Sequence, residues 1–419
     1  MKKSFIVFLI LIVFLVSLFS AYLLKKEESP LSKNDLEVIT NGVGVNIKRD
    51  VTEEDIETIA DAGFKWVRVD ITWEKVETKK GQYNFEDTGY DDLNKWLKDN
   101  NLKPYYILNY SNNLYEEKRS IVTERGRNAF TEFASAAAQR YSGQGAIWEI
   151  WNEPNFKTFW DPQPSYNQYA KLVKAVSPVV KKQDKSGIVV APAVSGLNKD
   201  SLVWLESLFK ENTLNDIDAV SVHPYRYSSP ESISEDYIKL KKLIGQYTDK
   251  NIPILSGEWG YSMAQSPEHR LTEGQQANYL TRMFLINAQQ GVPISIWYNW
   301  KNNGGDLNAR EQNFGVLWYD SEPKLSYLAI QTLTNQLEGY HFSKQIHSDN
   351  NGDYILEFKN SDDEKILAYW TTNSNHNSII KLATGKGKLI SMLGAVRHVE
   401  WGKSIDLKFL PSPSYLVIE

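Results

Sequence analysis

Short apolar runs alternate with helical segments along most of this chain, from residue 42 to residue 337. Each run has the length and the β-branched or aromatic composition of a buried strand, and between the runs apolar residues recur every three or four positions. The runs that we expect to form strands are 42–47, 65–71, 104–110, 147–151, 187–195, 218–225, 252–258 and 293–300. Eight strands that each precede a helix predict an α/β fold, a closed (β/α)8 TIM barrel, rather than an open sheet.

The pattern changes after Gly339, where alternating apolar and polar residues replace the helical spacing. Clusters of Asn, Asp, Gly and Ser separate the new runs, which is typical of antiparallel sheets. The runs expected to form strands there are 354–358, 366–370, 379–382 and 405–409. We therefore expect a barrel domain over residues 41–339 and a small C-terminal antiparallel β-sandwich domain over residues 340–419. The sandwich would pack on the barrel and stabilise it or, alternatively, bind carbohydrate.

A third pattern begins the chain. Two lysines precede an unbroken apolar run over residues 5–24, which as a helix would be about 30 Å long, the thickness of a bilayer core. Residues 1–26 are therefore predicted to be a transmembrane signal anchor or a cleavable signal peptide, and residues 27–40 a polar tether. Bulky Leu18 and Phe19 precede the candidate cleavage sites, which favours the uncleaved anchor.

The lysines set the expected orientation of this segment. Positively charged flanks stay on the inner side of a membrane, so the rest of the chain would lie on the outer face of the cytoplasmic membrane. If the signal is cleaved, the protein would instead be secreted.

Composition and motifs exclude several classes of function. The net charge is −5 and no long basic block follows the amino terminus, so nucleic acid is not expected as a partner. Cysteine is absent, which excludes disulfides, zinc–thiolate sites and a cysteine nucleophile. The six histidines have none of the spacings of zinc hydrolases, and neither a G-x-S-x-G elbow nor a phosphate-binding loop occurs. We expect a monomer that uses no metal and no cofactor.

Two of the predicted strands end in a glutamate. Glu153 follows the fourth strand and precedes Pro154, which stops the strand and should hold Glu153 in an extended conformation. Glu258 ends the seventh strand in the sequence Gly-Glu-Trp. In a barrel of parallel strands all carboxyl ends meet at one mouth. These two carboxylates are therefore expected to lie together, although they are far apart in the sequence.

The strand endings resemble those of clan A of the glycoside hydrolases. The motifs that carry the resemblance are Trp151-Asn152-Glu153-Pro154, Gly257-Glu258-Trp259 and His223-Pro224-Tyr225. A barrel followed by a small β domain is most similar to family 39, which includes β-xylosidases and membrane-associated bacterial exopolysaccharide hydrolases, and next to the cellulase-like family 5. The resemblance implies that Glu153 is the general acid/base and Glu258 the nucleophile.

Glycoside chemistry requires such a pair of carboxyl groups. Cleavage with retention of configuration needs a protonated carboxyl group at the leaving oxygen and an ionised carboxylate below the anomeric carbon, about 5 to 5.5 Å apart. The sequence thus predicts a retaining hydrolase of β-glycosidic bonds in a polysaccharide, endo-acting on an exopolysaccharide or a β-glucan-like polymer. The alternatives are an exo-acting β-xylosidase or β-glucosidase on short oligosaccharides, and a noncatalytic carbohydrate-binding barrel.

Further residues would support the two glutamates. By resemblance to the clan, Arg68 pairs with the nucleophile, although a buried arginine can also neutralise a core carboxylate such as Asp70. Asn152 resembles the residue that binds the sugar 2-hydroxyl. His223 and Tyr225 resemble the wall of the site, although a histidine at a strand end is often structural.

Aromatic residues are numerous, with 13 Trp and 23 Tyr, and their flat faces suit stacking on sugar rings. Trp297 matches the strand-eight aromatic of the clan that floors the sugar subsite. Five more aromatic residues near strand ends could extend a groove, namely Trp73, Tyr110, Trp160, Trp259 and Trp300. Each alone could equally pack in the core, but together they favour an elongated cleft for a polymer.

Overall fold

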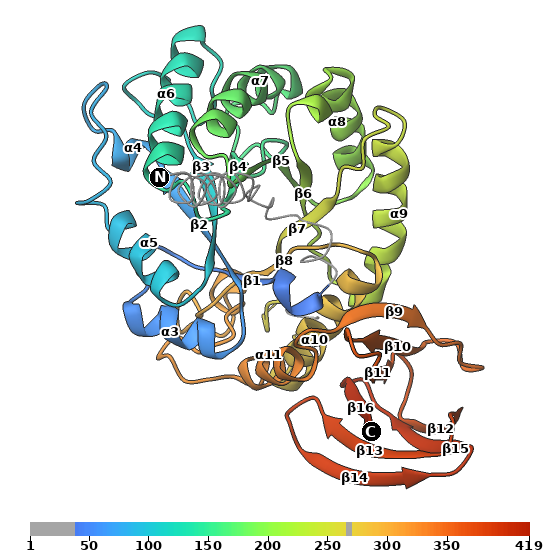
Figure 1. Cartoon of the computed structure of the whole chain (residues 1–419). Coiled ribbons are helices and arrows are strands. Elements are labelled where there is room, and N and C mark those ends of the chain that lie inside the picture. Colours follow the sequence, from blue (N-terminus) through green and yellow to red (C-terminus); the bar gives the residue numbers. More distant parts are fainter. Residues whose placement is uncertain (1–37, 265–269) are drawn as a thin grey trace, which may run out of the picture.

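The computed structural model describes residues 38–264 and 270–419 of the chain. Eight parallel strands close into a barrel in which each strand pairs with its neighbours in sequence and β8 pairs with β1 (Figure 1). These strands are β1 (Val43–Asn46), β2 (Trp66–Thr72), β3 (Lys103–Asn109), β4 (Ile147–Ile150), β5 (Ile188–Ser195), β6 (Ala219–His223), β7 (Ile254–Trp259) and β8 (Ser295–Trp297). The predicted barrel is confirmed, with strand ends that differ by a few residues.

Helices surround the barrel on its outside (Figure 1). They are α3 (Glu53–Asp61), the single turn α4 (Trp73–Val76), α5 (Tyr90–Asp99), α6 (Glu124–Arg140), α7 (Tyr166–Gln183), α8 (Lys199–Lys210), α9 (Ile233–Ile244), α10 (Glu273–Gln289) and α11 (Leu325–Gln336). Thr52 and Thr272 cap α3 and α10 through capping boxes, in which Asp55 and Gln275 are the reciprocal partners three residues later.

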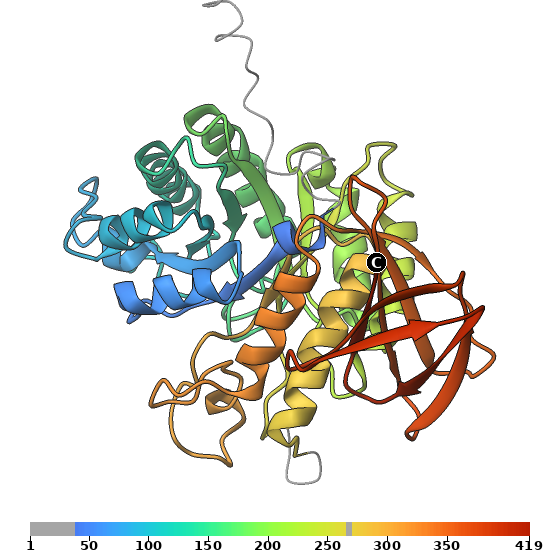
Figure 2. The same ribbon diagram turned by 60° about the horizontal axis from the view of Figure 1, so that its bottom comes forward.

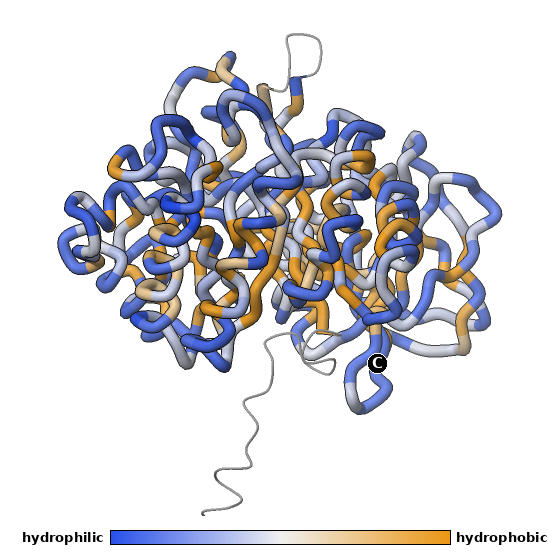
Figure 3. The backbone as a smooth tube through the Cα atoms, turned by 90° about the horizontal axis from the view of Figure 1, so that it is seen from above, coloured by the Kyte–Doolittle hydropathy of each residue, from blue (hydrophilic) through white to orange (hydrophobic). Residues whose placement is uncertain are grey.

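The apolar core lies in two layers on either side of the barrel wall. The inner cluster fills the barrel and consists of Trp66, Tyr105, Ile147, Ile188, Val190, Ala219, Leu255, Ile294 and Ile296. A larger cluster lies between the strands and the helices, and the hydrophobic positions are concentrated in the middle of the molecule (Figure 3). This arrangement follows from the strand alternation, because successive side chains point to opposite sides of the wall.

The C-terminal β domain, residues 340–419, contains two antiparallel sheets. Strands β14, β13, β16, β11, β10 and β9 form a six-stranded sheet in that order, and β12 pairs with β15. Their bounds are β9 (His341–Gln345), β10 (Asp353–Lys359), β11 (Lys365–Thr371), β12 (His376–Lys381), β13 (Gly385–Ser391), β14 (Val396–Trp401), β15 (Ser404–Phe409) and β16 (Ser414–Ile418). An apolar cluster that includes Leu367, Leu407 and Phe409 joins the two sheets, so the predicted antiparallel β domain is confirmed.

The β domain packs against α10 (Figure 2). Arg282 of α10 donates to both carboxylate oxygens of Glu231, each at 2.6 Å, and Trp370 of β11 donates its indole N–H to Glu231 Oε1 at 2.7 Å. Glu231 lies in the 3-10 turn η3 (Pro230–Ser232). All three side chains are buried, so a satisfied polar network joins the barrel to the β domain.

The predicted anchor, residues 1–26, and most of the predicted tether lie outside the described residues. The last tether residues, 38–40, already belong to the fold. Val38 forms a β-bridge with His341, and Ile39 donates its N–H to the Tyr340 carbonyl at 3.1 Å. Of the helices in ranges 38–264 and 270–419, none has the length and apolar character needed to cross a membrane.

Candidate active site

A buried arginine connects several strands at the barrel mouth. Arg68 of β2 points into the barrel and is 1% exposed. Its Nη1 donates to Asn46 Oδ1 at 3.1 Å and to Glu258, while its Nε and Nη2 donate to Glu149 Oε2 at 3.0 and 2.6 Å. Arg68 therefore pairs with Glu258, as the resemblance implied, and also neutralises a core carboxylate. The core carboxylate in direct contact with Arg68 is Glu149 of β4, and although burial raises the pKa of Asp70 more, the charge of Arg68 also lowers that pKa.

The Glu258 carboxylate is held by a donor on each oxygen. Arg68 binds Oε2, and the Tyr225 hydroxyl donates to Oε1 at 2.8 Å. Burial is the largest influence and raises the pKa of Glu258, but the charge of His223 when its ring is protonated, the charge of Arg68 and the hydrogen bonds from Tyr225 and Arg68 lower it more. The net pKa lies below its usual value, so the group is ionised at neutral pH, as a nucleophile must be.

Glu153 lies in a turn that follows β4, and not in the extended conformation predicted from Pro154. Its φ is +47°, in the left-handed region, and Trp151 and Ala193 also have positive φ. Two backbone hydrogen bonds impose this turn, from Trp151 N–H to the Leu108 carbonyl at 3.2 Å and from Glu153 N–H to the Ala193 carbonyl at 3.0 Å. These tertiary contacts outweigh the local preference of a residue before proline.

His223 connects Arg68 to Glu153. The ring is fully buried, its Nε2 lies 3.2 Å from Arg68 Nη2, and its Nδ1 lies 2.9 Å from Glu153 Oε1. Arginine can only donate, so in a neutral ring Nε2 accepts from Arg68 and Nδ1 carries the proton and donates it to Glu153. His223 thereby fixes the position of one oxygen of Glu153.

Asn152 is oriented by the same arginine. Its Oδ1 accepts from Arg68 Nη2 at 3.0 Å, so its amide nitrogen points away from Arg68. That nitrogen is a donor that can serve a sugar hydroxyl next to Glu153. Arg68, Asn152, His223, Tyr225 and the two glutamates are thus all brought together, as the sequence predicts.

Glu153, His223 and Glu258 are very close to each other. One polar atom from each of the three lies within 4.8 Å of the others. This spacing could hold a divalent cation. However, the Arg68 guanidinium already binds Glu258 and contacts His223, so a fixed positive charge competes for the same lone pairs. The donor set fits a substrate better than a metal ion.

Comparison with known proteins identifies the family of this chain. Residues 31–303 match the family model described as cellulase, glycosyl hydrolase family 5. The chain belongs to this family. A β-xylosidase of Caldicellulosiruptor saccharolyticus is 24% identical to this family 5 chain over 255 residues, which are 54% of this chain and 49% of the relative. The chain thus spans about half the length of this curated relative.

Solved structures share the fold of this family 5 chain. A family 39 glycoside hydrolase from Bacteroides cellulosilyticus WH2 has a TM-score of 0.79 and 23% identity, covering 92% of this chain and 82% of its own. A monomeric β-xylosidase from Caulobacter crescentus CB15 has a TM-score of 0.64 and 14% identity, covering 90% and 96%. The resemblance to clan A is confirmed, with a family 5 model matching in sequence and family 39 enzymes matching in fold.

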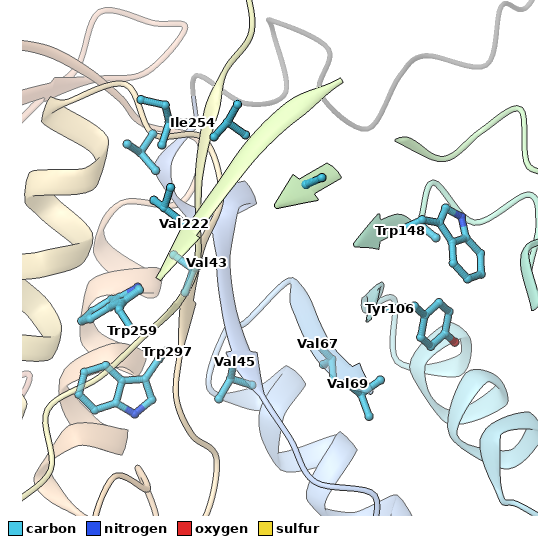
Figure 4. Close-up of a cluster of buried hydrophobic side chains, with 14 of the residues drawn as sticks. Val43, Val45, Val67, Val69, Tyr106, Trp148, Val222, Ile254, Trp259 and Trp297 are labelled. Atoms are coloured by element: carbon cyan, nitrogen blue, oxygen red, sulfur yellow. The ribbon is translucent and has the colours of Figure 1, made fainter. Parts of the chain in front are cut away.

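Most of the aromatic residues predicted to line the cleft are instead core residues. All five tryptophans predicted for the cleft are at most 1% exposed, namely Trp73, Trp160, Trp259, Trp297 and Trp300. Trp297 packs edge-on against Trp259 at 4.9 Å among the buried side chains outside the barrel wall (Figure 4). Its N–H donates to the Phe314 carbonyl at 3.1 Å. The prediction that Trp297 floors the sugar subsite is therefore wrong.

Two tyrosines near the site, Tyr298 and Tyr110, are partly exposed, unlike the tryptophans predicted for the cleft. Tyr298 follows Trp297 and, by the strand alternation, faces the opposite side of the wall. It contacts Tyr225 edge-on at 6.4 Å and is partly exposed. Burial raises the pKa of Tyr298, and the negative charge of Glu258 raises it further. The Tyr298 hydroxyl therefore lies close enough to Glu258 to be affected by its charge. Tyr110 is also partly exposed and experiences the charge of Glu258.

Asp70 and Asn109 also belong to the site, although no motif in the sequence marks them as site residues. The Asn109 amide donates to Asp70 Oδ1 at 2.5 Å, across β2 and β3. Burial raises the pKa of Asp70, while Arg68 and Asn109 lower it less. Glu149 was missed too, although the Tyr105 hydroxyl donates to it at 2.7 Å. A signal for these three residues exists in the sequence. They are polar residues at every second position of otherwise apolar strands, on the side that faces into the barrel.

Proposed function

We propose that this protein is a retaining β-glycosidase in which Glu258 is the nucleophile and Glu153 the general acid/base. The observation that supports this best is their spacing, since carboxylate oxygens of the two residues lie within 4.8 Å. Retaining enzymes hold the two carboxyl groups about 5 to 5.5 Å apart, whereas inverting enzymes leave about 6.5 to 9.5 Å for a water molecule. This short spacing of the two oxygens favours the retaining arrangement.

In the first step, the ionised Glu258 attacks the anomeric carbon. Arg68 and Tyr225 hold one oxygen each, which aims the carboxylate and keeps it deprotonated. Glu153 gives its proton to the leaving oxygen, and its carboxyl group is aligned by the hydrogen bond from His223. The bond from the anomeric carbon to the leaving oxygen breaks as the ester to Glu258 forms.

In the second step, Glu153 acts as the base that activates water. Esterification removes the negative charge of Glu258, so the newly ionised Glu153 has one fewer like charge beside it. Water attacks the anomeric carbon from the side that the leaving group vacated, and Glu258 departs as a carboxylate. Asn152 supplies a donor beside Glu153 for a sugar hydroxyl.

The proposed substrate is a chain of β-linked neutral sugars, cut within the chain. Its sugar class is suggested by the relatives, which include a β-xylosidase and, among the solved structures, a glucosidase from Croceicoccus marinus with a TM-score of 0.67 and 12% identity. Support for a long substrate comes from aromatic residues in the loops after β4, β6 and β8. These are Phe156, Tyr227 and Tyr319, which are 50%, 62% and 62% exposed. Exo action is the alternative that the name of the β-xylosidase relative favours.

Rescue of a nucleophile variant tests this proposal. Glu258→Gly should abolish turnover of β-xylosides and β-glucosides, and azide should restore part of it by entering the vacated space and yielding a glycosyl azide of inverted configuration. The product anomer is read by NMR. A noncatalytic carbohydrate-binding barrel would bind the glycans, but wild type would release no reducing ends. A glycosyl azide of retained configuration would mean that Glu258 is the general acid/base and Glu153 the nucleophile.

We also propose that residues 1–26 anchor the enzyme, as a monomer, on the outer face of the cytoplasmic membrane. The charge pattern and the apolar length support this. Full-length protein should remain with membranes after a high-salt wash, and protease added outside intact protoplasts should digest the barrel. A mature amino terminus near Tyr22 in the culture medium would show a cleaved signal instead.

A further inference from the structure

An arginine lies on an aromatic ring beside the proposed catalytic centre. Arg119 belongs to the loop between β3 and α6, and loops that leave the carboxyl ends of the strands share the barrel mouth with Glu258. Its guanidinium carbon lies 5.0 Å from the centre of the Tyr110 ring, within the range of a cation–π contact. Arg119 is exposed, and it has no part in the mechanism above.

Tyr110 connects this arginine to the catalytic centre. It follows the last residue of β3 and packs edge-on, at 5.4 Å, against Trp151, which lies two residues before Glu153. Burial raises the pKa of Tyr110 most, and the negative charge of Glu258 is among the charges that raise it further. Arg119 therefore lies on a ring that is itself close to the catalytic glutamates.

Hydrogen bonds fix the backbone of Arg119 between two loops of the mouth. Its carbonyl accepts from the Asp161 N–H at 3.0 Å, and the hydroxyl of the next residue, Ser120, donates to the Asp161 carbonyl at 2.7 Å. Asp161 belongs to the loop between β4 and α7, which also contains Glu153. Because the backbone is fixed and the guanidinium rests on a ring, Arg119 loses less conformational entropy when it binds a ligand.

Most of the donors of Arg119 have no partner. Its Nη1 donates to the Thr158 carbonyl at 3.5 Å, which is long for a hydrogen bond. Within ranges 38–264 and 270–419, neither Nε nor Nη2 has a hydrogen-bond partner, and no carboxylate oxygen lies within 4.0 Å of the guanidinium. Nε and Nη2 form an edge that can bind a carboxylate through two parallel hydrogen bonds. This free edge indicates an anionic ligand.

Other arginines at the mouth are already neutralised. Arg226, in the loop after β6, pairs with Asp236 at 3.1 Å, and Arg310, in the loop after β8, pairs with Glu311 at 2.5 Å. Arg119 has no such pair in the part of the chain that the structure describes. The acidic residues of the two loops around it that form no ion pair with it are Glu116, Glu117 and Asp161.

We propose that Arg119 is a specificity residue that binds a carboxylate carried by a substituent of the glycan chain. Nε and Nη2 donate one hydrogen bond to each carboxylate oxygen, while the Tyr110 ring supports the guanidinium. The inference rests on the proposed function, because a β-linked glycan must first enter the barrel mouth. It goes further in assigning a substrate class, namely a backbone of neutral sugars that carries acidic side groups.

An acidic glycan needs a positive group at this mouth. The chain carries a net charge of −5, and Glu258 is ionised in the free enzyme, so both repel a carboxylate that approaches the catalytic centre. Arg119 offsets this repulsion where the substituent binds. A neutral glycan is not repelled and gains little from the charge of Arg119.

Kinetics on two cellulose ethers test the charge preference. Arg119→Gln should lower kcat/KM for carboxymethylcellulose by about fivefold to tenfold, while kcat/KM for hydroxyethylcellulose, which has the same backbone without charge, changes less than twofold. Arg125→Gln is the matched control and should change neither value. Arg125 also stacks on a tyrosine, Tyr115, at 5.4 Å, but its Nη2 already donates to the Leu114 carbonyl at 2.7 Å. An equal loss on both polymers, or no loss on either, overturns the inference and leaves the proposed function intact.

Binding tests the same contact without requiring turnover. In affinity electrophoresis, carboxymethylcellulose in the gel should retard Glu258→Gln protein more than hydroxyethylcellulose does, and Arg119→Gln in that background should remove the difference. Equal retardation by the two polymers, or retardation by neither, overturns the inference. If wild type cuts neither polymer while carboxymethylcellulose retards Glu258→Gln protein through Arg119, the proposed function fails and the carboxylate site stands.

Discussion

Arg68 carries one positive charge and binds two carboxylates, Glu149 and Glu258. Esterification of Glu258 removes its charge during the proposed reaction. An arginine paired with Glu258 alone would then be buried without a counterion, a situation that costs about 3 to 5 kcal/mol. Glu149 does not react, so Arg68 keeps a partner in the free enzyme and in the glycosyl-enzyme. Glu149 thus lowers the free energy of the proposed covalent intermediate, because it keeps the buried Arg68 paired with a carboxylate.

Loss of the Tyr225 hydroxyl should change the pH dependence of the enzyme. The hydrogen bond from Tyr225 helps to lower the pKa of Glu258, so in Tyr225→Phe this pKa rises and Glu258 becomes protonated earlier as the pH falls. We expect the acidic limb of the kcat/KM profile to move to higher pH, with about a tenfold loss of kcat/KM on that limb. The alkaline limb should stay in place. An unchanged acidic limb would mean that Glu258 is not the ionised group.

Loss of the Glu153 carboxyl group should affect substrates unequally. Glu153→Ala should reduce hydrolysis of a natural glycan by about 100-fold to 10,000-fold, because its leaving group needs a proton. An activated aryl glycoside does not need that proton, so it should give a rapid burst followed by slow turnover, measured by stopped-flow absorbance. Azide should accelerate the slow step and yield a glycosyl azide of retained configuration. Equal losses on both substrates without a burst would make Glu153 a structural residue.

The sequence predicted the site residues that carry recognisable side chains at strand ends, such as Glu153, Glu258 and His223. It did not predict Glu149 or Asn109, because their roles depend on which strands become neighbours and on what faces them across the barrel. It also misassigned the conformation of Glu153, since the local preference before Pro154 is overcome by a hydrogen bond to Ala193, forty residues further on.

Strand β8 shows why the aromatic residues were harder to place than the strand itself. A run of apolar residues predicts a strand whichever way it faces, but a shift of one residue exchanges the two faces. Trp297 points to the helices and Tyr298 to the mouth. Helix α11 has a similar limit: the apolar character of Leu328 and Leu333 predicts that both pack inward, but Leu328 is 41% exposed and only Leu333 is buried.

Substitutions of Trp297, the last residue of β8, and of Tyr298, the residue after it, should separate stability from binding. Trp297→Ala leaves a large cavity in the core and should lower the free energy of unfolding by about 3 to 5 kcal/mol, measured by urea denaturation. Tyr298→Ala removes a ring that is partly exposed at the mouth, so it should change stability much less and raise KM several-fold. If Trp297→Ala raised KM and left stability intact, the tryptophan would face the substrate after all.

The barrel and the β domain should unfold together. Trp370 is fully buried, stacks on Tyr354 at 5.0 Å and donates to Glu231 on the barrel side. Trp370→Ala should therefore destabilise the whole molecule by about 3 to 5 kcal/mol and shift one common transition in scanning calorimetry. Tyr319→Ala is a suitable control, because it removes an exposed ring and should leave the transition in place. Two transitions, with only the smaller one shifted, would contradict this coupling.

The network of Glu231, Arg282 and Trp370 also determines how the β domain could assist catalysis. A sugar-binding module on a flexible linker can occupy many positions around the catalytic domain, and it raises the concentration of a bound glycan near the active site. The β domain is instead fixed against α10. A glycan held on it would lie at one set distance from the barrel mouth. Only a chain long enough to span that distance could gain from being held in both places at once.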